Sequence, residues 1–228
     1  MYGGTFDPIH NGHLAVAAAV EKVFRPEKIL LVPNDQPPHR SLRQLTAYAH
    51  RYAMVALAAA GQPHLAASVL ESPHRHEPGA FAYSIDTVRH LREEMAAEDR
   101  LLFVIGADAF LDIAKWRSPV ELLRACEIVA VSRPGFSLEE ALTALPRELL
   151  AAGTPELHNR RWAGGRVLRV SAGGATIHLL EGVASKVSAT GVRQAVQQKQ
   201  RFSHLVPLPV AEYIRKAGLY LEPPAARR

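Results

Sequence analysis

Residues 3–13 read GGTFDPIHNGH and lead directly into the apolar run LAVAAAV. Gly3 and Gly4 permit a tight turn and a close approach of the backbone to a ligand. The Asp-Pro and Asn-Gly pairs that follow are further turn signals, and we expect a helix to begin near His13. A glycine-rich turn that enters a helix N-terminus suits anions, because backbone N–H groups and the helix dipole both favour negative charge there. The stretch therefore predicts a turn-to-helix unit that holds phosphate.

His10 and His13 flank this turn and could donate hydrogen bonds to phosphate oxygens. An imidazole suits that task because its charge is tunable near neutral pH. The alternatives are a zinc-binding pair or two ordinary surface histidines. A third and a fourth ligand at familiar zinc spacing are missing from the sequence, which disfavours zinc.

Beyond this turn, short apolar segments alternate with helical ones. The expected strands are 28–33, 65–70, 100–106 and 127–132. The expected helices between them are 46–61, 83–97 and 119–126, with Ser84 as an N-cap and Pro119 in a first helical turn. Continuous apolar strands separated by helices predict an α/β fold with a doubly wound parallel sheet, in which ligands bind at the carboxyl ends of the strands.

The last third of the chain gives a weaker pattern. We expect a helical stretch over 138–153 that Pro146 breaks, an exposed loop over 154–165, and then a hairpin or successive strands. Two C-terminal helices are expected at 188–200 and 209–218. The sequence thus predicts one domain over 1–228, with 137–185 as a less regular, insertion-like region.

Composition narrows the class of protein. The 228 residues are 48% hydrophobic and 21% charged, which is ordinary for a globular protein, and no apolar run reaches the length of a membrane span. The start carries no signal-peptide pattern, and the single cysteine, Cys126, excludes an intrachain disulfide and fits the cytoplasm. The formal charge of +5 fits nucleic acid or small polyanions. Nucleic acid is disfavoured because aromatic and basic residues are not interleaved.

The residues 3–13 resemble the signature of nucleotidyltransferases that carry an H-x-G-H motif, and within them the bacterial nicotinate-nucleotide adenylyltransferases. The likeness continues in order along the chain. It includes VPNDQPPHR (32–40), YSIDTV (83–88), FVIGADAFLDIAKW (103–116), VSATGVR (187–193) and LPVAEYIRKAGLY (208–220).

This resemblance implies a Rossmann-like fold and transfer of the adenylyl group of ATP to nicotinate mononucleotide. The products would be deamido-NAD and pyrophosphate. The acceptor phosphate is itself the nucleophile, so catalysis would depend on in-line positioning and on donors that stabilise charge at the α-phosphate. Mg²⁺ would arrive on the ATP phosphates, and no protein ligand to a metal is expected.

The resemblance also implies roles for individual residues. His10, His13 and Arg193 would be catalytic, with Asp108 near the ribose and Trp116 stacked on the pyridine ring. The expected ATP-binding residues are Gly3, Gly4, Thr5, His10, His13, Gly106, Asp108, Ser188, Thr190 and Arg193. The expected mononucleotide-binding residues are His39, Arg40, Ser84 and Trp116. Without the resemblance, Ser188 and Arg193 would read as an ordinary capped helix.

Three features depart from the family pattern. Many relatives have Tyr where this chain has Arg117, and Ser84 stands where relatives often have Thr. Only Met1 and Tyr2 precede the glycines, where relatives have a longer first strand. We therefore expect a truncated first strand, a natural start upstream of Met1, and unpaired backbone groups at the centre of the sheet.

Other functions remain open at this stage. A phosphopantetheine adenylyltransferase shares the histidine motif but lacks the combination of the later motifs. A non-catalytic nucleotide sensor could keep the same pocket. A fragment of a class I aminoacyl-tRNA synthetase would need a tRNA-binding region, which is not obvious in the sequence. The preference between nicotinate and nicotinamide mononucleotide is also open.

Overall fold

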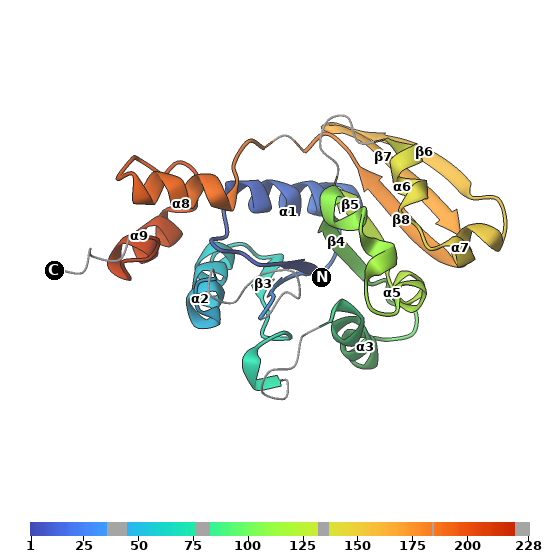
Figure 1. Cartoon of the computed structure of the whole chain (residues 1–228), viewed down its shortest axis with the longest axis horizontal. Helices are drawn as coiled ribbons and strands as arrows, with labels where there is room; N and C mark the ends of the chain where they lie inside the picture. Colours follow the sequence, from blue (N-terminus) through green and yellow to red (C-terminus); the bar gives the residue numbers. More distant parts are fainter. Residues whose placement is uncertain (36–44, 76–82, 132–136, 184, 222–228) are drawn as a thin grey trace.

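The computed structural model describes residues 1–35, 45–75, 83–131, 137–183 and 185–221. One sheet runs through the molecule with the strand order β3-β2-β1-β4-β5-β8-β7-β6 (Figure 1). Its parallel part consists of β3 (Leu65–Ala67), β2 (Ile29–Pro33), β1 (Tyr2–Gly4), β4 (Leu102–Gly106), β5 (Glu127–Val131) and β8 (Ala175–Leu180). The strand order turns in opposite directions from the β1–β4 pair, so the predicted doubly wound parallel sheet is confirmed.

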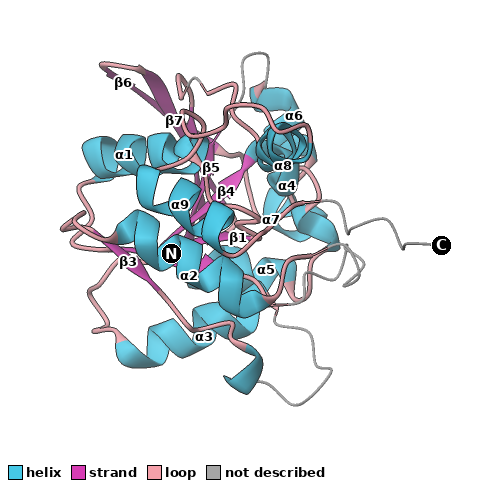
Figure 2. Cartoon of the chain, turned by 90° about the vertical axis from the view of Figure 1, so that its left-hand side faces the viewer, coloured by secondary structure: helices cyan, strands magenta, loops and turns pink. Residues whose placement is uncertain are grey.

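Helices cover both faces of this sheet (Figure 2). One face packs against α1 (Asn11–Phe24), α2 (Tyr48–Ala59), α8 (Ala189–Gln197) and α9 (Leu208–Lys216). The other packs against α3 (Ser84–Glu94), α4 (Ala107–Phe110), α5 (Pro119–Ala125), α6 (Leu138–Thr143) and α7 (Arg147–Ala151). In β4, Val104 belongs to the first core, whereas Phe103 and Ile105 belong to the second. Burial on both faces explains why this strand is apolar without alternation.

The central strand β1 is short, yet it is paired on both sides. Tyr2 lies opposite Leu31 of β2 and opposite Val104 of β4. The Met1 amino group donates to the Leu102 carbonyl at 2.7 Å, and the Val104 N–H donates to the Met1 carbonyl at 2.8 Å. These bonds satisfy backbone groups that the sequence analysis expected to be unpaired.

Segment 137–183 contains the clearest difference from the sequence-based expectations. Pro146 does separate α6 from α7, as expected. The expected loop over 154–165 is wrong, because Glu156–Trp162 forms β6, antiparallel to β7 (Gly165–Ala172), which pairs in turn with β8. Since β6 is exposed along almost its whole length, neither of its faces selects for apolar residues, and the alternation that reveals a strand is absent.

Local signals mark the starts of several helices. Pro119 opens α5, and Ser188 caps α8 by accepting from the Gly191 N–H at 3.1 Å. Ser84 is not an N-cap as expected. Tyr83 occupies that position, and its side chain makes no capping hydrogen bond to the first N–H groups of α3. None of the described helices combines the length and the hydropathy that crossing a membrane requires.

Candidate functional site

The turn between β1 and α1 is held by distant parts of the chain. Asp7 is buried, and its carboxylate accepts from the Tyr220 hydroxyl at 2.8 Å and from the Thr46 N–H at 3.3 Å. Its carbonyl accepts from the Arg193 guanidinium at 2.6 Å. The turn therefore carries little freedom of its own, because segments near residues 46, 193 and 220 all fix it.

His10 and His13 form a reciprocal cap at the start of α1. The Gly12 N–H donates to His10 Nδ1 at 3.1 Å, and the His10 N–H donates to His13 Nδ1 at 3.2 Å. The two rings stack with their centroids 3.7 Å apart. A ring nitrogen that accepts carries no proton, so each neutral imidazole keeps its hydrogen on Nε2. The pair thus presents two N–H donors at a helix N-terminus.

Burial fixes the charge state of these imidazoles. It lowers the pKa of His10 to about 4 and, together with the neighbouring His10, the pKa of His13 to about 3. On one side His13 meets the edges of the Tyr2 and Phe6 rings, at centroid distances of 6.1 and 5.0 Å. Both side chains are therefore neutral donors at pH 7, and an anion beside them would raise both pKa values.

The start of α8 lies against the same turn. Arg193 bridges the Thr190 hydroxyl, at 3.2 Å, and the Asp7 carbonyl. A Cβ placed on Gly12 would lie 2.9 Å from Ser185 Oγ, which shows how closely the segment before α8 approaches α1. The residues predicted to bind phosphate from opposite ends of the chain are thus brought together, and Ser188 caps α8 beside them.

A cavity of about 350 Å³ opens at the carboxyl ends of β1 and β4. Among the predicted residues, those that line it are Gly3, Gly4, Thr5, Ser84, Gly106 and Trp116. Its apolar wall includes Trp116, whose ring centroid lies 6.2 Å from that of Phe103. A Cβ on Gly3 would lie 3.3 Å from the Phe103 ring, and one on Gly4 would lie 3.0 Å from Phe6. The two glycines therefore leave room for aromatic side chains at the floor of the site.

Two predicted groups of residues stand apart from this cavity. Asp108 is exposed on α4, beside Gly106, and is not among the lining residues. His39 and Arg40 lie outside the described residues. Of the residues predicted to bind the mononucleotide, Ser84 and Trp116 are therefore the two that line the described cavity.

A buried carboxylate that the sequence did not predict, Glu71, lies in the cavity wall. Glu71 accepts from Asn34 Nδ2 at 2.6 Å and from the Thr87 hydroxyl at 2.9 Å, which joins the end of β2 to α3. Burial raises its pKa to about 6, while the two hydrogen bonds act in the opposite direction. A single acidic residue between helices gives no sequence pattern, so nothing in the sequence signalled this role.

Arg51, on α2, fixes the backbone of the same region through hydrogen bonds. Its guanidinium donates to the carbonyls of Thr5 at 2.8 Å and Asn34 at 2.6 Å, and also to those of Thr46 and Asp35. The side chain is fully buried on α2. From the sequence, Arg51 could add positive charge to the pocket or pair on a helix face; instead it binds backbone carbonyls. Its position three and four residues before Met54 and Val55 places it on the apolar face of the helix, which is the sequence signal for its burial.

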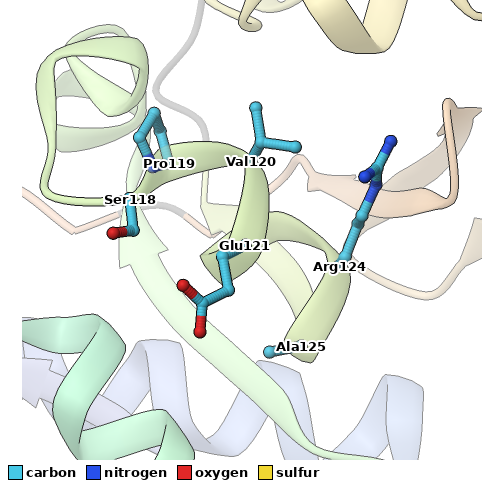
Figure 3. A pocket seen from close by; sticks show the side chains of 6 residues that line it. All are labelled: Ser118, Pro119, Val120, Glu121, Arg124 and Ala125. Atoms are coloured by element: carbon cyan, nitrogen blue, oxygen red, sulfur yellow. The ribbon is translucent and has the colours of Figure 1, made fainter.

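A second depression of about 650 Å³ runs along α5, where Figure 3 shows its lining residues, Ser118 to Glu121 with Arg124 and Ala125. Glu121 is already paired with Arg89 at 2.7 Å, and Arg124 Nε donates to the Gly173 carbonyl at 3.0 Å. Its two charged side chains are thus engaged within the protein, and we assign no ligand to it. Across the described ranges, no cluster of three or more His, Cys, Asp or Glu side chains is arranged to hold a metal ion.

Comparison with known proteins gives a consistent result. The cytidylyltransferase-like family model matches residues 1–195. A protein designated a nicotinate-nucleotide adenylyltransferase in Moorella thermoacetica is 37% identical over 223 residues, covering 96% of this chain and 90% of that protein. One with the same designation in Geobacter metallireducens is 33% identical and covers 96% of each chain.

A solved structure supports the fold. The nicotinic acid mononucleotide adenylyltransferase of Plasmodium falciparum, complexed with NaAD, has a TM-score of 0.66 to this chain and is 18% identical to it. The match covers 96% of this chain and 95% of the Plasmodium chain. At this level of identity the likeness shows the fold alone.

Proposed function

The chain belongs to the nicotinate-nucleotide adenylyltransferase family, and from that premise we propose that it transfers the adenylyl group of ATP to nicotinate mononucleotide. The products are deamido-NAD and pyrophosphate. The observation that carries this proposal is the junction of the Gly3–Thr5 turn, the histidine pair and Arg193 beside a cavity with an aromatic wall. The relatives argue against the phosphopantetheine alternative, because they match 96% of the chain.

In the proposed reaction, an oxygen of the mononucleotide phosphate attacks the α-phosphorus of ATP. The new P–O bond forms as the bond from the α-phosphorus to the bridging oxygen breaks, and pyrophosphate leaves with that electron pair. The attacking group is already an anion, so no side chain needs to act as nucleophile or strong base. This chain contributes donors: the Nε2–H groups of His10 and His13, the N-terminus of α1, and the guanidinium of Arg193.

The substrates would lie on two sides of the glycine turn. We place the ATP phosphates against His10, His13, Ser188, Thr190 and Arg193. The adenosine would lie along Gly3, Gly4 and Thr5 toward Gly106 and Asp108, and the pyridine ring would lie in the cavity on Trp116, near Ser84. His39 and Arg40 stay predictions for the mononucleotide phosphate.

Mg²⁺ enters this proposal as part of the nucleotide substrate. The turn offers N–H donors, which suit phosphate oxygens, rather than a set of carboxylates, which would suit the metal. Bound to the triphosphate, the ion would screen its charge and stabilise the leaving pyrophosphate. We further propose a cytoplasmic location, which the single, buried Cys126 supports.

The test is pyrophosphate release from ATP with nicotinate mononucleotide, in wild type and in His13→Asn. The Asn side chain places an acceptor near the position of Nδ1, so it can keep the cap of α1, but it lacks the Nε2–H. We expect a loss of about a hundredfold in kcat, because one transition-state donor is removed. Thermal melting would verify that the fold is retained.

The matched control is His158→Asn, on the exposed strand β6, which should leave the rate unchanged. A wild type that binds ATP without releasing pyrophosphate would instead indicate a nucleotide sensor. A near-normal rate in His13→Asn would show that His13 only caps α1 and does not act in catalysis.

A further inference from the structure

Arg117 directly follows Trp116; it is exposed, and both residues line the cavity. Its guanidinium carbon sits 4.6 Å from the centroid of the Tyr83 ring. Tyr83 is the N-cap residue of α3, so this contact holds the arginine beside the helix end that opens on the cavity. An arginine stacked in this way loses little further freedom when it binds a planar anionic group.

The other charges of the cavity are already engaged. Lys115 is paired with Asp112 at 2.5 Å, and both oxygens of Glu71 accept hydrogen bonds from protein side chains. In the part of the chain that the structure describes, no carboxylate forms an ion pair with Arg117. The Arg117 guanidinium is thus not held by an ion pair within the described residues and can bind an anionic group, although the Glu71 carboxylate lines the same cavity.

The two candidate acceptors differ only at the group on the pyridine ring. Nicotinate mononucleotide carries a carboxylate there, and nicotinamide mononucleotide carries a neutral carboxamide. Their phosphate, ribose and ring nitrogen are the same, so a positive charge near the ring substituent is the feature that separates them. A guanidinium can also bind a carboxylate with two parallel hydrogen bonds, which a carboxamide cannot accept.

We propose that Arg117 is a specificity-determining residue that makes this cavity favour the acid mononucleotide over the amide. The proposal rests on the adenylyl transfer proposed above and names the residue behind its choice of acceptor. The first N–H groups of α3, which the side chain of the N-cap residue Tyr83 does not cap, add to the positive potential on the same side of the cavity.

The experiment measures kcat/KM for both mononucleotides at saturating ATP in wild type, Arg117→Gln and Arg117→Lys. We expect Arg117→Gln to lower kcat/KM for nicotinate mononucleotide by about tenfold or more and to change the value for the amide by less than about threefold. Arg117→Lys keeps the charge and should retain part of the preference. A merely structural role would lower both values together, so the ratio of the two is the decisive measurement.

Two matched variants sharpen the test. Lys115→Gln removes the same charge from the same cavity, but from a side chain already paired with Asp112, so the ratio should shift less than in Arg117→Gln. Arg124→Gln removes a charge from α5 outside the cavity and should leave the ratio unchanged. An unchanged ratio in Arg117→Gln, or an equal shift in Lys115→Gln, would overturn the inference. A wild type that adenylylates neither mononucleotide would overturn the proposed function instead.

Discussion

At the scale of single residues, ionisation of Glu71 in the cavity wall makes the stability of the fold depend on pH. Both of its carboxylate oxygens accept hydrogen bonds, yet burial dominates and raises its pKa to about 6. An acid with a raised pKa binds more protons in the folded state than in the unfolded state. Folding stability therefore falls as pH rises from about 4.5 to about 6, and the cost persists above that range.

Because ionisation of Glu71 lowers the stability of the fold, Glu71→Gln is an informative variant. Its free energy of unfolding minus that of wild type should increase by about 2 kcal/mol between pH 4.5 and pH 7, because Gln does not ionise and so avoids the cost of the buried charge. Urea unfolding of both proteins across this range measures the difference. Taking the difference removes the titration of groups common to both, such as His10 and His13. A difference that does not change with pH would mean that Glu71 is not the titrating group.

At the scale of elements, the segment after α9 holds the phosphate-binding turn in place. The Tyr220 hydroxyl donates to the buried Asp7 carboxylate. Tyr220→Phe should cost about 1–3 kcal/mol of stability and lower kcat/KM for ATP by about threefold to tenfold, because the turn is less well fixed.

The matched control for this variant is Tyr213→Phe. Tyr213 lies on α9, and its hydroxyl bonds His50 Nδ1 at 2.8 Å rather than Asp7. It should lose stability without losing kcat/KM. Equal kinetic effects in the two variants would show that α9 stabilises the fold as a whole rather than the turn.

The elements also show what sequence could and could not reveal. The strands β2, β4 and β5 were predicted because burial on both faces makes them continuously apolar. β6 was missed because neither of its faces is buried. Ser84 failed as an N-cap although its residue type was right, since the backbone begins α3 one residue earlier than expected for a cap at that position.

In the candidate site, the features that depend on neighbouring residues in the sequence could be predicted. These are the glycine turn, the two histidines and the cap at Ser188. The family resemblance then linked the two ends of the chain. The roles of Arg51 and Glu71 depend on carbonyls and side chains far away in sequence, which only the folded chain brings to them. Glu71 gives almost no sequence pattern, and the helical spacing of Arg51 indicates its burial but not its partners.

At the scale of the whole molecule, one end of the parallel sheet carries the candidate site and the other carries a stabilising polar network. The cavity and the phosphate-binding turn lie at the carboxyl ends of the strands. Toward the opposite end, Glu127 at the start of β5 joins Arg100, at 2.7 Å, to the buried His178 of β8, also at 2.7 Å. The network ties three neighbouring parts of the sheet together without touching the site.

Substitution of Glu127 should therefore separate stability from activity. Hydrogen bonds from Arg100 and His178 lower the pKa of the Glu127 carboxyl to about 2. An acid with a lowered pKa contributes stability above its unfolded value, about pH 4.5, and loses it as pH falls toward 2.

Glu127→Gln should thus lower the free energy of unfolding at pH 7 by about 2 kcal/mol and remove this acid dependence, after discounting for the exposed Arg100. Denaturant unfolding at several pH values measures the loss, and kcat/KM for both substrates at 25 °C should stay at the wild-type value because the variant is still folded there. A stable variant with impaired kinetics would show that the two ends of the sheet are coupled.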